Sequence, residues 1–318
     1  RRAAGHTSWS RPWKEKMGAE PMRERFIETA TGLLDRDDRL ALILAEISAT
    51  AFEPAAQRHP DRVVNVGIRE QLMVGVASGF ALTGFRPIIH TIASFAVERP
   101  YEQLKIDLGH QDVGAVVVAH GASYDYSTSG RTHHSPEDVA LIDTLPGWDV
   151  HVPGHPDEAE RLLREAAAAD GRAYIRLSTT QNLVAHAGGV IRRGGAATVV
   201  AVGPVLDRVL AATTGLDVTV LYLATVRPFD AALLRSMLSG TDIVVVEPYL
   251  EGTSSAAIAA SLPDVRHRLL AIGVPKVEYR HYGTIEEHDA AHGLDAESLH
   301  RRIQTFLGDP LAAMERHP

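Results

Sequence analysis

Short apolar runs alternate with segments of helical spacing along most of the chain, and this alternation limits the possible folds more than any other feature. Residues 40–47 are apolar except for Glu46, and residues 114–119 form another such run. A short apolar run bounded by turn residues is typical of a strand buried on both faces of a parallel sheet. Residues 22–34 instead carry apolar side chains at helical spacing. The sequence therefore predicts an α/β fold with two doubly wound domains and mainly parallel sheets.

The domain boundary is predicted from a change in character, because residues 181–196 are polar and rich in glycine. A chain of 318 residues has room for two domains of ordinary size. We expect a leader or partner-docking arm over residues 1–21, a first domain over 22–180, a linker over 181–196 and a smaller second domain over 197–318. The run of charged residues in the leader is short and contains both signs, which favours a flexible or partner-docking arm over a nucleic-acid-binding arm.

Composition excludes several classes of protein. The formal charge of −8 predicts no general attraction to nucleic acid or to an anionic membrane. The chain has no cysteine, which removes disulfides, thiolate metal sites and cysteine nucleophiles. No apolar run approaches the ~20 residues that span a bilayer. These features are typical of a cytoplasmic enzyme.

One strand-turn-helix stretch, residues 62–81, draws attention because a carboxylate lies in a crowded place. An apolar strand leads to a turn at Gly67, and Glu70 then opens a helix rich in small residues. A buried carboxylate must be paired or functional, because burying it alone is costly. Ligands of doubly wound sheets bind at the carboxyl ends of the strands. Five residues are predicted to meet there: Glu46, Glu70, Phe95, His120 and His133.

The order of several motifs resembles the C-terminal half of transketolase and of its relative deoxyxylulose-phosphate synthase. The most specific strings are Asn65-Val66-Gly67-Ile68-Arg69-Glu70-Gln71, Phe95 followed by Arg99-Pro100-Tyr101-Glu102-Gln103, and Gly130-Arg131-Thr132-His133. Supporting strings are Val226-Arg227-Pro228-Phe229-Asp230 and Gly283-Thr284-Ile285-Glu286-Glu287. The resemblance covers roughly residues 22–307. It implies a pyrimidine-binding domain followed by a smaller C-terminal domain.

The resemblance implies a thiamine diphosphate enzyme in which Glu70 takes the place of the family glutamate. That glutamate hydrogen-bonds N1′ of the aminopyrimidine and favours the 4′-imino tautomer that removes the proton from C2. Phe95 is similar to the aromatic that stacks on the pyrimidine, with an ordinary core phenylalanine as the alternative. Glu46 and Arg99 are expected on the cofactor side of the site. For Glu70, the alternative is a helix-start carboxylate favoured by the helix dipole.

The resemblance also implies which residues face the substrate. His133 matches the histidine that faces the substrate, as both a catalytic and a binding residue, and His120 falls near a second such histidine. Ser129 and Arg131 are expected to contact the substrate. We predict no metal ligands in this chain, because adjacent residues such as His133 and His134 rarely hold one ion together.

The chain departs from the family pattern in three places. The half that carries the Gly-Asp-Gly motif for magnesium and diphosphate is not among these 318 residues. The resemblance therefore implies a partner, an N-terminal transketolase subunit that holds Mg²⁺. Ser129-Gly130-Arg131 replaces the family string Asp-Gly-Pro, and Thr179 stands where the family has a phosphate-binding arginine. The missing guanidinium weakens the expectation of a sugar phosphate substrate, with compensation by Arg131 or Arg176 as the alternative.

Three functional hypotheses follow. The leading one is the C-terminal subunit of a split transketolase, which transfers a two-carbon ketol unit from a small sugar or keto donor to an aldehyde acceptor. It leaves room for an atypical substrate in specialised metabolism, and it implies self-association within a heterotetramer. The second is the beta-type subunit of a 2-oxoacid-decarboxylating enzyme with the same cofactor. The third is a non-catalytic assembly subunit.

Overall fold

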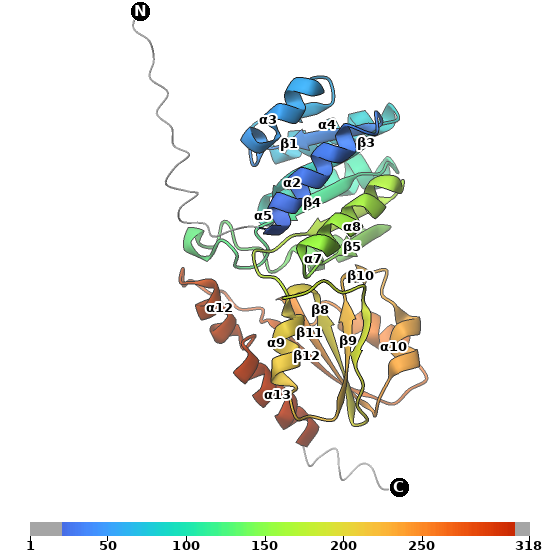
Figure 1. The fold of residues 1–318 in the computed structure, drawn as a ribbon, viewed down its shortest axis with the longest axis vertical. Coiled ribbons are helices and arrows are strands. Elements are labelled where there is room, and N and C mark those ends of the chain that lie inside the picture. Colours follow the sequence, from blue (N-terminus) through green and yellow to red (C-terminus); the bar gives the residue numbers. More distant parts are fainter. Residues whose placement is uncertain (1–20, 309–318) are drawn as a thin grey trace, which may run out of the picture.

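The computed structural model describes residues 21–308. The leader expected over residues 1–21 lies outside this range except for Pro21, which opens helix α2. Figure 1 shows two α/β units arranged end to end, the first in the upper half of the view and the second in the lower half. The predicted fold class is thus confirmed.

The first unit is built on a seven-stranded sheet. Its own strands are β1 (Leu40–Leu44), β2 (Val63–Asn65), β3 (Arg86–Ile92), β4 (Val116–His120), β5 (Trp148–His151) and β6 (Arg172–Arg176). The strand order is β10-β5-β6-β4-β3-β1-β2, and every pair within the sheet is parallel except β10 with β5.

Helices cover both faces of this sheet, which explains why its strands read as continuous apolar runs. In β1, Leu40, Leu42 and Leu44 pack with residues of α2 and α8, whereas Ala41 and Ile43 pack with residues of α4, α5 and α7. Each such leucine contributes about 1.5–3 kcal/mol when buried. The helical segments are α2 (Pro21–Leu34), α3 (Ala49–Arg58), α4 (Glu70–Leu82), α5 (Ala93–Val97), α6 (Tyr101–Gln103), the π-helical η1 (Leu104–His110), η2 (Ser127–Ser129), α7 (Asp138–Asp143) and α8 (Pro156–Ala168).

The second unit has a five-stranded sheet in the order β12-β11-β8-β9-β7. Its strands are β7 (Gly189–Arg192), β8 (Ala197–Val202), β9 (Val218–Leu223), β11 (Asp242–Leu250) and β12 (Arg268–Val274), and only β7 is antiparallel to its neighbour. The helical segments are η3 (Gly203–Val205), α9 (Leu206–Ala212), α10 (Ala231–Met237), α11 (Ser255–Ser261), α12 (Ile285–His292) and α13 (Ala296–Gly308). One core lies between the sheet and α9 with α13, and another lies under α10 and α11.

Three details differ from the sequence interpretation. Residues 181–196, predicted to be the linker, contain the edge strand β7. Strand β10 (Thr225–Arg227) belongs to the second half of the sequence but pairs with β5 of the first sheet. Helix α12 was not predicted, although Thr284 and Glu287 form a capping box at its start. Both strands are short, and their pairing partners are distant in sequence, so local pattern did not reveal them.

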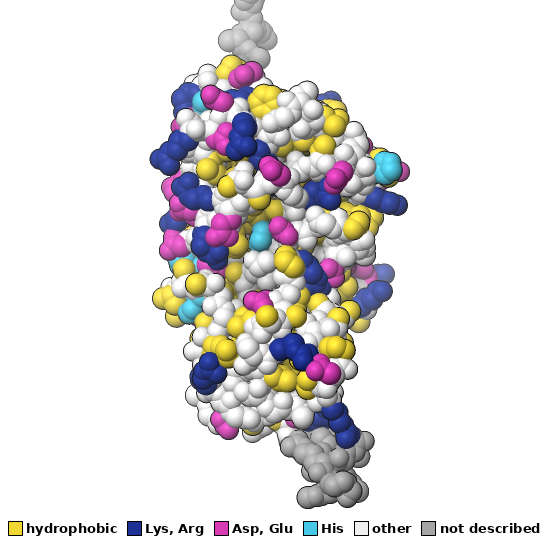
Figure 2. Space-filling view, turned by 90° about the vertical axis from the view of Figure 1, so that its right-hand side faces the viewer, with side chains coloured by type: hydrophobic (Ala, Val, Ile, Leu, Met, Phe, Trp, Pro, Cys, Tyr) yellow, Lys and Arg dark blue, Asp and Glu magenta, His cyan; other side chains and the backbone are white. Residues whose placement is uncertain are grey.

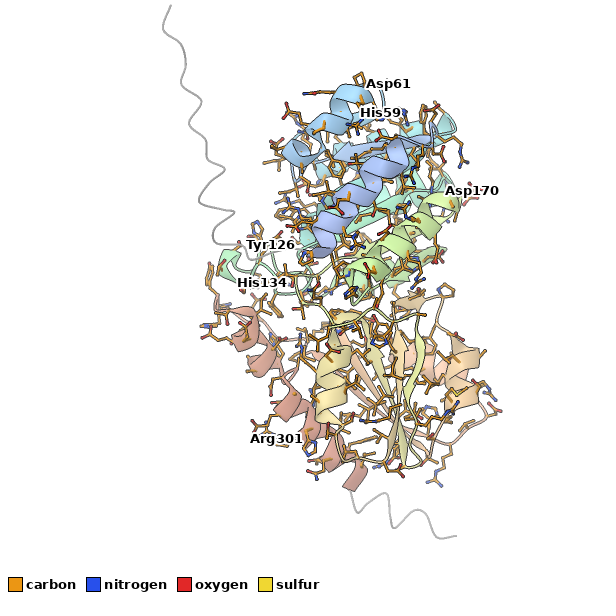
Figure 3. The ribbon with its side chains drawn as sticks, in the orientation of Figure 1. His59, Asp61, Tyr126, His134, Asp170 and Arg301 are labelled. Carbon is orange, nitrogen blue, oxygen red and sulfur yellow. The ribbon has the colours of Figure 1, made fainter. Side chains whose placement is uncertain are left out.

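The two units also meet through a cluster of histidine and tyrosine rings, which we call the junction cluster: Tyr124, His134, His288 and His292. Tyr124 stacks on His288 and His292 with ring centroids 4.2 and 4.8 Å away. His134 packs edge-on against Tyr124 at 4.8 Å. Figure 3 labels His134 in the loop after β4, on the side that α12 approaches. All four side chains are buried, so the cluster joins the loop to the second unit.

We expect the junction cluster to make stability depend on pH. Burial, together with the neighbouring histidines, lowers the pKa of His292 from 6.5 to about 4. The unfolded chain therefore binds more protons between pH 4 and 6.5, and the free energy of unfolding falls as the pH falls through this window. In His292→Gln, this fall should be shallower by up to about 1.4 kcal/mol per pH unit. Urea denaturation of the full chain at several pH values measures both slopes.

The control for this experiment is His110→Gln, because His110 is exposed at the end of η1. That variant should keep the pH slope of the parent protein. Equal slopes for His292→Gln and the parent would contradict the assignment of acid sensitivity to the cluster.

The surface adds two observations. In the described part of the chain, no helix combines the length and the apolar character that a membrane crossing needs. Figure 2 shows acidic and basic side chains interspersed over one face of the molecule. That face presents no extended area of a single charge.

The topology fixes where a ligand site can form. In the first sheet, the chain places β2 on one side of β1 and β3 on the other. Such a reversal opens a crevice at the carboxyl ends of the strands. The segments that follow β1, β2 and β3 start at this edge and carry Glu46, Glu70 and Phe95, and β4 ends there at His120.

Candidate active site

The turn between β2 and α4 is shaped by the side chain of Asn65. Its Oδ1 accepts hydrogen bonds from the backbone N–H groups of Glu46 and Gly67, both at 3.0 Å. Its Nδ2 donates to Glu46 Oε2 at 3.1 Å. Gly67 has a φ of +70°, which glycine adopts without the cost of a Cβ clash. These contacts reverse the chain so that α4 begins at Glu70 beside the end of β1.

Glu70 is the first residue of α4, and only 3% of it is exposed. A helix N-terminus favours a negative charge at this position. Its Oε1 also accepts a hydrogen bond from Arg99 Nη1 at 2.9 Å. The neighbouring Gln71 donates from Nε2 to the backbone carbonyl of Arg99 at 3.1 Å. The buried carboxylate is thus paired, and two contacts fix the 99–100 turn against the start of α4.

Phe95 lies in α5, directly after β3, and faces the same space. The guanidinium of Arg99 lies over its ring, with Cζ 3.5 Å from the ring centroid. A cation at this distance from an aromatic face is attracted by the ring quadrupole. The Arg99 guanidinium, a flat group with nitrogen at its edge, therefore lies between Phe95 and Glu70.

His133 comes to this site from the loop between β4 and α7. Its ring centroid lies 5.0 Å from that of Phe95, in an edge-to-face arrangement. Its Nδ1 is 3.0 Å from Thr132 Oγ1. Burial, and then the nearby Arg99 cation, lower the pKa of His133. The imidazole is therefore neutral at neutral pH, and can accept or donate a proton.

Behind His133 lies a tyrosine that the sequence analysis did not select. The Tyr126 ring is 6.3 Å from that of His133, and its hydroxyl is 2.6 Å from His120 Nδ1. His120 is buried, and burial followed by the proximity of His90 holds its pKa well below 6.5. A Cβ on Gly121 would lie 2.3 Å from the Tyr126 ring, so this position requires glycine. The glycine next to His120 was therefore the sequence signal that a bulky side chain packs there. Figure 3 labels Tyr126 in this loop.

Three predicted site residues make their described contacts elsewhere. Glu46 is exposed and bonded to Asn65. Ser129 ends η2 and donates its backbone N–H to Tyr126 O. Arg131 forms ion pairs with Glu137 at 2.6 Å and Glu278 at 3.7 Å. Their roles in cofactor or substrate binding stay predictions, whereas Glu70, Arg99, Phe95 and His133 form one continuous set of contacts.

The described residues contain no cluster of three His, Asp or Glu side chains placed to hold a metal ion. The side chains of the site instead provide a buried carboxylate, an aromatic face and a neutral imidazole, linked through the contacts of Arg99 and Phe95. Such a donor set fits a planar nitrogen heterocycle better than an ion.

Family comparison matches both units. The transketolase pyrimidine-binding domain matches residues 20–184, and the transketolase C-terminal domain matches residues 187–299. The chain belongs to the transketolase family. The resemblance stated from the motifs is thereby confirmed. Membership implies dependence on thiamine diphosphate.

Relatives in the family support this assignment over nearly the whole chain. The chain is 51% identical over 292 residues to an uncharacterized 33.6 kDa protein in the fasciation locus of Rhodococcoides fascians, covering 89% of this chain and 94% of that protein. It is 27% identical to the 6-deoxy-6-sulfo-D-fructose transketolase subunit SqwH of a Clostridium species, covering 78% and 83%. A solved structure described as a split gene transketolase, inactive beta4 tetramer, superposes with a TM-score of 0.78 at 25% identity, covering 90% and 97%.

The residues present fit the pyrimidine end of the transketolase cofactor. Glu70 would meet an edge nitrogen of the ring, and Phe95 would meet its face, as both now meet the Arg99 guanidinium. His133 stands next to Phe95, with ring centroids 5.0 Å apart.

Proposed function

We propose that this chain is the C-terminal subunit of a two-component transketolase. In this proposal, it transfers a two-carbon ketol unit from a ketose donor to an aldehyde acceptor, together with an N-terminal subunit that holds Mg²⁺ and the diphosphate. The observation that carries the proposal is the convergence of the buried Glu70 with the half-buried Phe95 and His133 at the crevice of a transketolase pyrimidine-binding domain.

The roles of this chain's residues follow from their positions. When bound, thiamine diphosphate supplies a carbon nucleophile at C2. Glu70 holds the proton that it shares with ring nitrogen N1′, and its burial keeps water from competing for that bond. Phe95 orients the ring by stacking. His133, which is neutral, binds a substrate hydroxyl and moves a proton at that atom.

The partner subunit is supported by the surface around Glu70. Ile68 is 71% exposed and Leu72 is 48% exposed, on either side of Glu70 at the start of α4. Ile106 on η1, which packs beside α4, is 42% exposed. An apolar surface at the mouth of a site is typical of a protein interface. Two relatives of similar extent are themselves described as a transketolase subunit and a split gene transketolase tetramer.

The substrate is expected to lack a phosphate at the position that the family binds through arginine. Thr179 stands at this place, and its N–H and Oγ1 both donate to the carboxylate of Asp125, at 3.0 and 2.9 Å. Nearby, Arg176 is buried against Asp138 at 2.7 Å, so its charge is already compensated. This arrangement offers a phosphate no free guanidinium.

Reconstitution with the N-terminal subunit tests the proposal. Calorimetry should show thiamine diphosphate binding in the presence of Mg²⁺, and the complex should transfer a ketol unit without releasing carbon dioxide from a 2-oxoacid. Donors are compared as pairs of free and phosphorylated ketoses, and the free ketose should have the higher kcat/KM. Release of carbon dioxide without ketol transfer would favour the decarboxylating alternative. A complex that binds no thiamine diphosphate would rule out both enzymes.

A further inference from the structure

The side chain of Arg99 lies in the middle of the candidate site. Its guanidinium stacks on Phe95 at 3.5 Å and donates to Glu70 at 2.9 Å. A guanidinium is flat and carries N–H groups at its edge. It therefore makes with this chain the two contacts expected of a flat heterocycle that stacks on Phe95 and hydrogen-bonds Glu70 at an edge nitrogen.

The two partners of this pair differ in their freedom to move. Glu70 is 3% exposed and fixed at the start of a helix, whereas the Arg99 side chain is 40% exposed. The backbone of Arg99 is held separately, by the hydrogen bond from Gln71 and by the following Pro100. The long side chain of Arg99 can therefore swing into solvent without moving the turn, while the carboxylate stays in place.

We propose that Arg99 is a displaceable stand-in for the aminopyrimidine ring. The inference rests on the proposed function. Before the cofactor is bound, Arg99 forms an ion pair with the buried Glu70 carboxylate and covers the face of the Phe95 ring. This chain's part of the site is therefore stable without ligand. Entry of the aminopyrimidine requires the guanidinium to leave both positions. Arg99 is thus a gating residue. The free-energy cost of moving its guanidinium out of the site reduces the apparent affinity for the cofactor.

The exchange also moves one proton. A carboxylate that accepts from a guanidinium needs no proton of its own, because the donor supplies the hydrogen. Ring nitrogen N1′ has a lone pair and accepts a hydrogen bond, so Glu70 must then carry the hydrogen as the neutral acid. Replacing Arg99 by the ring therefore takes one proton from solvent to the carboxylate.

Other charged and titratable groups surround this exchange. They include Arg69 on the turn before α4, Glu98 next to Arg99, Asp107 on η1 near Gly75, and His133 on the loop. None of these described groups contacts the Glu70 carboxylate. Burial has the largest effect on the pKa of Glu98 and of His133, but the Arg99 cation lowers both. Cofactor affinity and proton uptake are therefore compared between the parent and an Arg99 variant at more than one pH.

Calorimetry of the complex with the N-terminal subunit tests this proposal, with thiamine diphosphate titrated at saturating Mg²⁺. Buffers of different ionisation enthalpy report the protons taken up on binding. We expect net uptake of about one proton more by the parent than by Arg99→Ala, because a buried carboxylate without its cation already favours the neutral acid. We also expect Arg99→Ala to bind the cofactor about five- to a hundredfold more tightly.

Lys105→Ala is the matched control, since Lys105 is an exposed cation on η1. Loss of that charge should weaken the binding of the anionic cofactor or leave it unchanged. The Lys105→Ala complex should take up the same number of protons as the parent complex. Weaker binding by Arg99→Ala than by the control, or equal proton uptake, would overturn the proposal while leaving the proposed function intact. If Arg99→Ala does not assemble, Arg99→Lys, which cannot stack as a plane, should show the same changes in smaller measure. No binding by the parent would overturn both.

Discussion

Replacement of Glu70 by glutamine should lower ketol transfer by the assembled enzyme by about 10²–10⁴-fold, the usual contribution of a positioned acid-base group. Glutamine keeps the shape of glutamate and can still hydrogen-bond, but its amide does not exchange a proton with N1′. Glu70 is the carboxylate joined to the Phe95 face through Arg99, which donates to the one and stacks on the other. The measurement is initial-rate kinetics of the complex at saturating thiamine diphosphate.

Two further measurements make this result specific. Sedimentation should show that Glu70→Gln assembles with the N-terminal subunit as the parent does. The control variant Glu102→Gln, in the nearby helix α6, should retain the activity of the parent. Unchanged activity of Glu70→Gln and of Glu70→Ala would instead favour the non-catalytic assembly subunit.

The largest effect on stability is expected at Asp138. Its Oδ2 accepts from Arg176 Nε at 2.7 Å and from the Tyr174 hydroxyl at 2.6 Å. The side chains of both members of the ion pair are almost fully buried, at 0% and 1% exposed. Asp138→Asn leaves the guanidinium buried without an opposite charge, which costs about 3–5 kcal/mol of the free energy of unfolding. Urea denaturation of the full chain measures this loss.

The exposed pair of Arg161 and Glu165 on α8 provides a matched comparison. Glu165→Gln should cost less than about 1 kcal/mol, because solvent screens a surface ion pair. The double variant Asp138→Asn with Arg176→Met should recover part of the loss, since it removes the uncompensated cation. A loss at Asp138 no larger than that at Glu165 would contradict the importance of the buried pair.

The buried pair also links stability to the site. Arg176 ends β6, and its Nη2 donates to Ser123 Oγ at 2.6 Å and to Ser135 O at 3.3 Å. Ser123 and Ser135 form a bridge across the base of the loop that carries Tyr126 and His133. The cation therefore closes this loop at both ends, and its loss is expected to disturb the position of His133.

Periodicity and motif order were sufficient for several conclusions. The alternation of apolar runs and helical spacing determined the α/β class, because strands covered on both faces must be apolar throughout. The string from Asn65 to Gln71 placed Glu70 at a strand-to-helix turn, since Gly67 permits the positive φ that the turn needs. The short strands β7 and β10 were not foreseen, because their pairing depends on residues far away in the chain.

The sequence by itself determined which residues follow the strand ends, and therefore that Glu70, Phe95 and His133 are candidates for one site. Only the tertiary structure decided how they meet. It placed Arg99 on the Phe95 ring, Tyr126 between His133 and His120, and Arg131 in ion pairs away from this contact set. The physical reason is that strand order and helix packing set which side chains converge, whereas a linear pattern records only the local conformation of each segment.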